Sequence, residues 1–373
     1  MRILPIIRTA IASMSRPTQL VIDVAALKHN FLEVQKLASG KSIIAMVKSN
    51  AYGHGIDRIA RALQQADAFG VASLEEGLQL RHSGITQPIV LMEGLFNADE
   101  LDLVTEHRFQ LVIHEQHQVQ ALENFTAKYP IPIWLKIDTG MHRLGFDPDK
   151  FSEIYARLLS CETVQKPLNL MSHLAEADAV DRAFTVKQIE LFKQLTQDLP
   201  GEKSLANSAG IIAWPSAHED WVRPGLMLYG ASPIIGHRGQ EHHLKPVMSL
   251  TSELIAIHDL PQGARVGYGG TWTCPEAMRV GVVAIGYGDG YPRHVRNGVP
   301  VLLNNRPCPL IGRVSMDMLT IDLRTQPDAK IGDKVLLWGP GLPVEVVAEF
   351  SETTAYELLT RITQRVRVVT QDS

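Results

Sequence analysis

Cysteine is scarce in this sequence, whose 373 residues include 3, at Cys161, Cys274 and Cys308. They lie far apart, are odd in number and show neither a CxxC pair nor the Cys/His spacing of a metal site. This scarcity excludes a disulfide framework and leaves no motif for a structural metal, so we expect no metal site. We expect the three thiols to be buried and reduced, as in a cytoplasmic protein.

An excess of charge of one sign is also lacking. Charged residues make up 20% of the chain and the net charge is −4, with no basic stripe that would favour nucleic acid or an anionic membrane surface as a partner. No apolar run approaches the ~20 residues that a membrane span needs. We therefore expect a soluble protein that binds neither nucleic acid nor membranes.

A clear signal peptide is lacking as well. Residues 1–13 combine two arginines with apolar side chains, but Pro5 and Arg8 interrupt the apolar stretch. What remains falls short of a signal-peptide core of about 7–15 residues. We interpret residues 1–13 as a non-native or disordered extension, with Met14 as the alternative first residue, and expect a cytoplasmic location.

The sequence does contain a long alternation of strand-like and helical patterns. With 45% hydrophobic residues, a chain of this length suits two domains, or a large barrel with a smaller domain. The strands predicted for the first part are Ser42–Lys48, Phe69–Ser73, Pro88–Glu93, Gln110–His114, Ile131–Asp138, Leu168–His173, Lys203–Asn207 and Val222–Tyr229. Eight strand–helix units over about 200 residues are typical of a (β/α)8 TIM-type barrel. A doubly wound sheet uses the same units but has no reason to stop at eight.

The pattern changes after Gly230, where helical periodicity gives way to strand-like runs separated by Gly, Pro and Asn. The strands predicted there are Ser249–His258, Arg279–Tyr287, Pro300–Leu303, Met318–Asp322 and Lys334–Trp338, with one late helix at Val344–Ile362. We therefore divide the chain into an α/β barrel domain at 14–245 and a smaller, mainly β domain at 246–373. The segment Gln19–Asn30 precedes the barrel, and its strand-like half could pair with the second domain.

Polar and charged residues close the predicted barrel strands, where enzymes of this fold collect their chemistry. They are Lys48, the pair His142–Arg143, His173, the pair Asn207–Ser208 and Arg223. Lys48 closes the apolar run Ile43–Val47, and burial at such a strand end lowers the pKa of an amine, which makes it able to attack a carbonyl group. A lysine that simply reaches solvent is the alternative that the residues alone leave open.

The stretch Ala45–Gly55, AMVKSNAYGHG, resembles the cofactor-attachment signature of alanine racemases. The resemblance continues in the family's order through KIDTGMHRLG from Lys136, SHLA from Ser172, NSAG from Asn207, RPGL from Arg223, GYGG from Gly267, GYGDGY from Gly286, GRVSMD from Gly312 and YELL from Tyr356. It covers nearly the whole chain after Met14. It implies a barrel with a β domain, pyridoxal 5′-phosphate as cofactor, and the interconversion of L- and D-alanine.

The resemblance also implies catalytic roles. Lys48 would hold the cofactor and act as one base, and Tyr268 would be the second base on the opposite face. Racemisation requires a proton to leave one face of Cα and to return on the other, which two bases achieve. His173 and Arg223 would form a hydrogen-bonded chain with Tyr268 that favours its deprotonated form. Arg223 would face the pyridine nitrogen and, being charged, oppose its protonation.

Binding residues follow from the same resemblance. The cofactor and its phosphate would contact Tyr52, Asn207, Ser208 and Tyr356, with backbone amides near Gly225 and Leu226. Arg143 and the amide of Met316, next to Asp317, would bind the substrate carboxylate. Tyr287 and Tyr291 would narrow the entry channel and favour a small substrate. The chain departs from some members at Ser204, where a histidine touches the cofactor-facing arginine, so that contact is expected to be weak or absent here.

Lys136 matches a position that is often carbamylated in the family, which would make it an anion that orients Arg143. An ordinary lysine paired with Asp138 is the alternative. Because Tyr268 belongs to the second domain and would serve the neighbouring subunit, the resemblance implies a homodimer with shared active sites.

Three other functions remain to be weighed. A racemase of broader specificity, acting on serine or basic amino acids, would use the same residues. A basic amino acid decarboxylase shares the domain plan but carries a carboxylate where this chain has Arg223. A non-enzymatic cofactor-binding barrel lacks the second domain and hence Tyr268. The D-alanine could serve peptidoglycan synthesis, or the enzyme could act in alanine catabolism.

Overall fold

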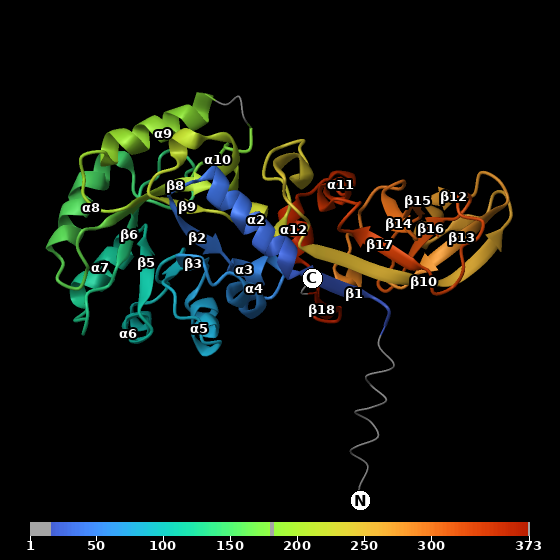
Figure 1. Cartoon of the computed structure of the whole chain (residues 1–373), viewed down its shortest axis with the longest axis horizontal. Coiled ribbons are helices and arrows are strands. Elements are labelled where there is room, and N and C mark those ends of the chain that lie inside the picture. The colour runs from blue at the N-terminus through green and yellow to red at the C-terminus, as the bar shows by residue number, and fades with distance from the viewer. Residues whose placement is uncertain (1–15, 180–182, 372–373) are drawn as a thin grey trace, which may run out of the picture. The chain divides into compact units, whose positions relative to one another are not determined.

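The computed structural model describes residues 16–179 and 183–371. They form two compact units (Figure 1), one comprising Val24–Lys245 and the other combining residues 246–371 with residues 16–23. The extension predicted at residues 1–13 lies outside the described residues, as does Met14. None of the helices in the described part of the chain is long and apolar enough to cross a membrane.

Strands β2 to β9 close into a barrel of eight parallel strands within the described residues, which confirms the predicted fold class. They are β2 (Ser42–Met46), β3 (Ala68–Val71), β4 (Ile89–Leu91), β5 (Phe109–Ile113), β6 (Ile133–Lys136), β7 (Asn169–Met171), β8 (Lys203–Asn207) and β9 (Trp221–Arg223). The barrel closes where Ser42 and Ile43 of β2 pair with Trp221 and Val222 of β9. Their side chains are largely buried, as expected for strands that face an interior on one side and helices on the other.

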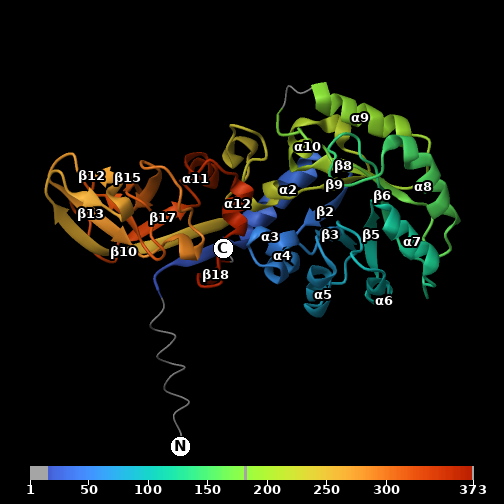
Figure 2. The ribbon, with the colours of Figure 1, turned by 180° about the vertical axis from the view of Figure 1, so that it is seen from behind.

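Helices surround this barrel, as both views of the ribbon show (Figure 2). They are α2 (Val24–Leu37), α3 (Lys48–Tyr52), α4 (Ile56–Ala62), α5 (Leu74–His82), α6 (Leu101–Glu106), α7 (Gln116–Asn124), α8 (Pro148–Ser160), α9 (Ala183–Thr196) and α10 (Ser208–Ala213). Short 3-10 turns are η1 (Ala98–Glu100), η2 (Pro215–Ala217), η3 (Leu226–Tyr229) and η4 (Gly239–His242).

The last barrel strand is shorter than the sequence predicts. The strand predicted at Val222–Tyr229 ends at Arg223, and η3 occupies its second half. Pro224 lacks the amide hydrogen that a further ladder bond would need. The chain therefore turns at Gly225, two residues after Arg223.

The second unit is built on an eight-stranded sheet, in the order β13-β16-β15-β14-β17-β10-β1-β18 among the described residues. Its strands are β1 (Gln19–Asp23), β10 (Met248–Leu260), β13 (Met278–Val283), β14 (Pro300–Leu303), β15 (Arg306–Ile311), β16 (Leu319–Asp322), β17 (Lys334–Trp338) and β18 (Arg367–Gln371), with β11 (Arg265–Val266) and β12 (Trp272–Thr273) as a separate hairpin. The 13-residue β10 also pairs with β13. The N-terminal strand β1 lies between β10 and β18.

The sequence does not predict four strands of this unit, β11, β12, β15 and β18, and it predicts one late helix where there are two. Strand β15 was not expected because it contains Pro307 and Pro309. Leu310 donates its amide hydrogen to the carbonyl of Val299, on the β14 side. Because successive residues of a strand point their amides to opposite sides, the backbone nitrogens of both prolines face away from β14. Pairing with β16 begins only at Leu310, so neither proline costs a ladder bond.

The predicted late helix at Val344–Ile362 is two helices, α11 (Val344–Phe350) and α12 (Ala355–Thr360). Glu352 between them has a φ of 50°. A residue with left-handed backbone cannot continue a right-handed helix, so the chain breaks there.

Candidate functional site

Lys48 opens the short turn α3 directly after β2, at the carboxyl end of the barrel. The four residues that follow it all have left-handed backbone, with φ between 52° and 54°. None of them is glycine, and each L-residue in this conformation costs about 1–2 kcal/mol. Such a turn persists only when its surroundings hold it, so the contacts around Lys48 are part of the site.

Three side chains hold this turn. Asn50 accepts the amide hydrogen of Ile56 at 2.9 Å, and its own amide donates to Glu76 at 3.3 Å. His54 places Nδ1 3.0 Å and 2.8 Å from the carbonyl oxygens of Ala51 and Tyr52. Because carbonyls only accept, Nδ1 carries the hydrogen. Burial lowers the pKa of His54 to about 4, so the ring is neutral at neutral pH.

Tyr52 is brought against the loop after β9. Its ring stacks on Tyr229, with the two centroids 4.8 Å apart, and Tyr229 donates its hydroxyl hydrogen to the carbonyl of Met46 at 2.8 Å. A Cβ atom at Gly225 would lie 2.5 Å from the Tyr52 hydroxyl. The absence of a side chain at Gly225 therefore allows the tyrosine hydroxyl to reach the backbone.

Ser208, the first residue of α10, faces the same loop. Its hydroxyl oxygen accepts the amide hydrogens of Gly225 at 2.8 Å and Met227 at 3.4 Å. Asn207 caps α10 by accepting an amide hydrogen from its first turn at 2.9 Å. Of the predicted phosphate-binding residues, Tyr52, Ser208 and Gly225 thus converge, with Leu226 next in the chain at the start of η3.

Arg223 is buried and contacts neutral acceptors. Its guanidinium donates to the Ser204 hydroxyl and to the Ser172 carbonyl, both at 2.5 Å, and to the Leu205 carbonyl at 3.1 Å. Burial lowers its pKa to about 9, so it remains charged at neutral pH. The contact at Ser204, expected to be weak or absent, is therefore made directly by the serine hydroxyl.

His173 lies next to Arg223 and has a defined tautomer. The Arg223 Nη2 atom is 3.3 Å from His173 Nδ1, and since a guanidinium only donates, Nδ1 is the acceptor and Nε2 carries the hydrogen. Burial, followed by the charge of Arg223, lowers the pKa of His173 well below its usual value. The imidazole is therefore neutral and presents an Nε2–H donor.

Lys136 ends β6 and is buried among cations. Burial, then the charges of Arg223, Arg143 and Lys48, lowers its pKa to about 7. Asp138 accepts amide hydrogens at 2.9 Å and 3.0 Å and lies 3.2 Å from His142 Nδ1. No ion pair joins it to Lys136 in the described part of the chain. The amine of Lys136 is thus divided between its charged and neutral forms near pH 7.

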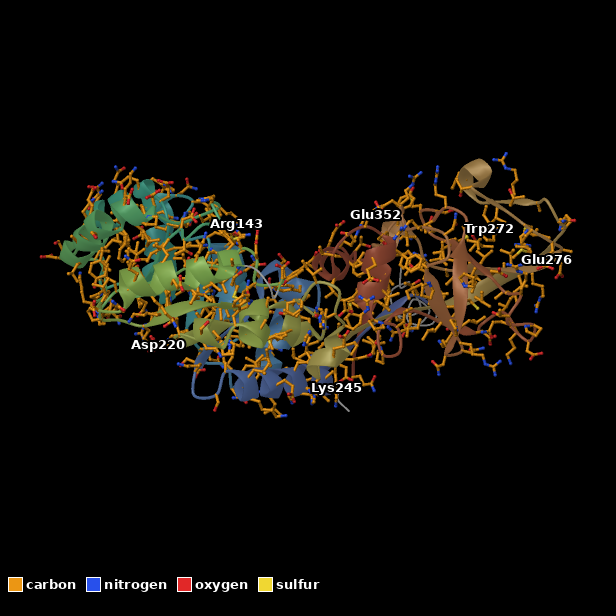
Figure 3. The ribbon with its side chains drawn as sticks, turned by 90° about the horizontal axis from the view of Figure 1, so that it is seen from above. Arg143, Asp220, Lys245, Trp272, Glu276 and Glu352 are labelled. Atoms are coloured by element: carbon orange, nitrogen blue, oxygen red, sulfur yellow. The ribbon has the colours of Figure 1, made fainter. Side chains whose placement is uncertain are left out.

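Arg143 lies on the loop between β6 and α8 and is exposed. Figure 3 shows it at one end of the barrel, whereas Asp220, which precedes β9, lies at the other. The predicted residues Lys48, Lys136, His173 and Arg223 belong to the same end, where the strands finish. Lys48, Arg143 and Arg223 give this end of the barrel positive charge, which suits it to anions.

Tyr268 lies on the hairpin between β11 and β12 of the second unit and is 67% exposed. Glycines on both sides have positive φ, and Arg265 donates to the carbonyl of Gly269 at 2.8 Å. Trp272 of the same hairpin and Glu276 lie at one end of this unit, and Glu352 lies at the other (Figure 3). The hairpin presents the phenol outward on a tight, glycine-rich turn.

Met316 and Asp317 lie on a loop that packs against η6 (Tyr287–Asp289). The Met316 carbonyl accepts the amide hydrogen of Gly288 at 2.8 Å, and the Asp317 carboxylate lies 2.5 Å from Arg365. The Asp317 carbonyl accepts from Arg16 at 2.9 Å. The loop is therefore fixed from both sides.

Asp289 is the centre of this arrangement and is fully buried. Arg16 contacts both of its oxygens, at 2.7 Å and 3.2 Å, and Arg365 lies 3.0 Å away. The Gly286 amide donates to it at 2.9 Å. One buried carboxylate thus joins the N-terminal residues to the loops that carry Tyr287 and Met316.

One predicted residue of this unit is placed differently from its expected role. Tyr291 was expected to narrow an entry channel, but it is 0% exposed and its ring stacks on Trp338. Burial raises its pKa. The prediction for Tyr291 is therefore wrong, because its side chain is in the core; Tyr287 is partly exposed and Tyr356, on α12, is 42% exposed.

Sequence reasoning missed His54, Arg16 and Asp289. His54 lies inside the quoted lysine motif and Asp289 inside GYGDGY, so the motifs marked both residues without giving them a role. Nothing in the sequence around Arg16 indicates that it pairs with a carboxylate 273 positions away.

Comparison with known proteins identifies relatives over both units. The family models described as "Alanine racemase, N-terminal domain" and "Alanine racemase, C-terminal domain" match residues 22–233 and 247–370. The alanine racemase of Coxiella burnetii is 50% identical over 361 residues, which cover 95% of this chain and 99% of that protein.

Solved structures agree with these matches. The biosynthetic alanine racemase of Pseudomonas aeruginosa superimposes with a TM-score of 0.93 at 44% identity, covering 95% of this chain and 99% of that one. The alanine racemase of Bartonella henselae, solved with covalently bound pyridoxal phosphate, superimposes with a TM-score of 0.86 at 29% identity, covering 95% and 99% of the two chains.

Proposed function

The chain belongs to the alanine racemase family, and from this premise we infer that it is a pyridoxal-phosphate-dependent enzyme that interconverts L-alanine and D-alanine. The observation that carries this conclusion is the environment of Arg223, a buried cation held by neutral acceptors. A decarboxylase of the same domain plan would carry a carboxylate there. A racemase benefits from a cation, which opposes protonation of the pyridine nitrogen and so limits side reactions.

The barrel residues fit pyridoxal phosphate. When bound, the cofactor withdraws electrons from Cα of the amino acid and so makes its hydrogen acidic. The hydroxyls of Tyr52 and Ser208 form a compact donor set that suits a phosphate dianion, together with the amide of Gly225, whose hydrogen would pass from Ser208 to the phosphate. A Cβ atom at Gly225 would occupy the space beside the Tyr52 hydroxyl, so the glycine keeps that space open. We propose that Lys48 binds the cofactor covalently, that Leu226 adds a second amide, and that Tyr356 and Asn207 complete the pocket.

Two bases on opposite faces of Cα are proposed to move the proton. The Lys48 amine removes or returns it on one face, and the phenolic oxygen of Tyr268 acts on the other. A phenol needs help to lose its proton near neutral pH. The Nε2–H of His173, directed by its contact with Arg223, is the donor that would stabilise the phenolate.

The substrate carboxylate is proposed to bind the guanidinium of Arg143 and the backbone amide of Met316. Lys136 is proposed to be carbamylated, since a buried amine with a pKa of about 7 is available to react with CO2. The resulting anion would offset the three neighbouring cations and orient Arg143. Intact mass measured without acid treatment should show the added CO2; a mass for unmodified lysine at saturating bicarbonate would reject it.

We propose a homodimer in which Tyr268 serves the site of the partner subunit. Its support is the exposure of the Tyr268 ring on a hairpin turn, since large exposed aromatics often mark interfaces. A small substrate is favoured by the partly exposed Tyr287. A cytoplasmic location is supported by three free, buried thiols. Supply of D-alanine to peptidoglycan and alanine catabolism are both compatible with this reaction.

The test is a chiral assay of the purified protein against a panel of L-amino acids, with and without added pyridoxal phosphate. We expect D-alanine to form fastest, and Lys48→Ala to abolish both turnover and the visible absorbance of the bound cofactor. Faster racemisation of serine or lysine would favour the broad-specificity alternative. Release of CO2 without racemisation would overturn the proposal.

A further inference from the structure

We propose that His54 is a positioning residue for the cofactor phosphate. Through its ring nitrogen it holds the left-handed turn after Lys48, and through its ring face it helps to place the Tyr52 hydroxyl beside Gly225. This inference rests on the proposed function of the barrel end, and it assigns a role to a motif histidine that takes no part in the two-base reaction.

The first observation is the backbone of the turn. Four consecutive residues without a glycine adopt positive φ, a conformation that L-residues disfavour. Tyr52 is the last of these four residues, so its backbone conformation sets the position of its hydroxyl. Any relaxation of this backbone towards ordinary φ values would swing the tyrosine ring away from Gly225, so the turn needs a partner that holds its end.

His54 is that partner. It is 1% exposed, and its Nδ1–H points at the carbonyls of Ala51 and Tyr52, at 3.0 Å and 2.8 Å. Its Nε2 atom has no hydrogen-bond partner among the described residues. The Nδ1–H group of His54 therefore binds the final two carbonyls of the strained turn.

The second observation is a group of three rings. The centroids of His54 and Tyr229 lie 4.5 Å apart, and those of Tyr229 and Tyr52 lie 4.8 Å apart. Tyr229 is itself tied to β2, since its hydroxyl donates to the Met46 carbonyl. Tyr52 is thus held on its backbone by the imidazole nitrogen and on its ring by Tyr229, which His54 supports from another side.

A histidine that merely fills the core would affect stability without discriminating between ligands. A histidine that places Tyr52 must affect binding of the phosphate more than binding of the pyridine ring. Pyridoxal, which lacks the phosphate, and pyridoxal phosphate separate these two contributions.

The experiment measures the Kd of the apoprotein for pyridoxal phosphate and for pyridoxal, together with the melting temperature. His54→Phe keeps a ring but loses the donor, and His54→Asn places an amide N–H near the position of Nδ1. Tyr52→Phe reports the loss of the hydroxyl itself. His107→Phe is the matched control, because His107 precedes β5 at the opposite end of the barrel and also stacks on an aromatic ring.

We expect His54→Phe to raise the Kd for pyridoxal phosphate about tenfold, which is the loss that one or two hydrogen bonds can cause. The Kd for pyridoxal should change much less. The selectivity for the phosphate should fall to that of Tyr52→Phe, with no further fall in the double variant. His54→Asn should recover part of it. His107→Phe should retain wild-type selectivity.

An equal rise in Kd for both ligands would overturn the positioning role. So would a lower melting temperature with unchanged selectivity for pyridoxal phosphate over pyridoxal. If His54→Phe does not fold, His54→Asn decides alone: selectivity below wild type yet above that of Tyr52→Phe supports the role, and selectivity equal to that of Tyr52→Phe rejects it. Failure of the wild-type protein to bind pyridoxal phosphate would instead overturn the proposed function.

Discussion

The ionisable side chains at the mouth of the barrel differ in what burial does to them. Arg223 keeps its charge although its pKa falls to about 9, and His173 becomes a neutral donor with its hydrogen on Nε2. Lys136, with a pKa of about 7, titrates near neutral pH. At the residue scale, then, position rather than residue type decides which groups are charged.

A pH-dependent stability follows for Lys136. Its pKa is about 7 in the folded protein but near 10.4 in an unfolded chain, so between these values the unfolded state binds more protons and the unfolding free energy rises with pH. In CO2-free buffer, we expect the unfolding free energy of the wild type to rise by about 3 kcal/mol more than that of Lys136→Met between about pH 7 and about pH 9.5. Denaturant titrations at the two pH values measure this gain. A difference that does not change with pH would show that the amine is not buried as described.

At the scale of elements, the turn α3 is the least ordinary piece of backbone in the barrel. It puts four left-handed residues between a parallel strand and the helix α4, where a standard βα loop would use glycine. Its geometry depends on Asn50, Glu76 and His54, none of which the strand–helix pattern requires. The strained backbone of α3 consequently lowers stability, and in return it fixes the positions of Lys48 and Tyr52.

Glycine should therefore stabilise one position of this turn. Ser49 is exposed with a φ of 54°, and Ser49→Gly should raise the unfolding free energy by up to about 1 kcal/mol because glycine adopts this backbone freely. Ser49→Val should lower it. The control is Ser152 in α8, where glycine should destabilise by roughly 0.5 kcal/mol. A loss of stability in Ser49→Gly, measured by thermal unfolding, would show that the turn is not strained.

At the scale of the whole molecule, the chain order does not match the two units. Residues 16–23 precede the barrel in the sequence but belong to the second unit, where β1 pairs with β10 and β18. Arg16 extends this link to the buried Asp289. Residues 16–23 are therefore part of the framework for the loops that carry Tyr287 and Met316.

Arg16 should accordingly matter for stability. Its removal leaves Asp289 with Arg365 as its remaining guanidinium partner, and breaking one side of a buried ion pair typically costs about 3 kcal/mol. We expect Arg16→Ala to lower the unfolding free energy by about 1–3 kcal/mol, with the lower value applying if Arg365 compensates. Arg361→Ala, which removes a surface pair with Glu357 four residues before it, should cost less than about 0.5 kcal/mol. Equal effects of the two substitutions would contradict this role.

The proposed dimer is tested by mixing subunits. Lys48→Ala and Tyr268→Phe should each be nearly inactive, but their heterodimer should contain one site with both bases and recover up to about a quarter of wild-type activity in an equimolar mixture, because half of the random dimers are mixed and each has one good site of two. Native mass spectrometry verifies that subunits exchange. Confirmed exchange without recovery would mean that Tyr268 serves the site of its own subunit.

Much of the fold could be predicted because its causes are local. Apolar runs at regular spacing indicate the eight barrel strands, and most of the residues that close them do meet at one end. The errors also have local causes: Pro307 and Pro309 obscured β15, and Glu352 broke a periodic pattern that looked like one helix. Tyr291 was misplaced because a motif shows that a tyrosine is present, not which way it points.

The sequence by itself determined the chemistry that this chain can carry, because the order of Lys48, Arg223 and Tyr268 within their motifs identifies a family. Tertiary structure alone decided the states of those groups. The hydrogen on His173, the lowered pKa of the Lys136 amine, the stacking of Tyr52 on Tyr229 and the pairing of Arg16 with Asp289 all depend on groups from distant parts of the chain. Electrostatics and hydrogen bonding act over a few ångströms in space, whatever the separation along the sequence, and so only the folded chain brings these properties into being.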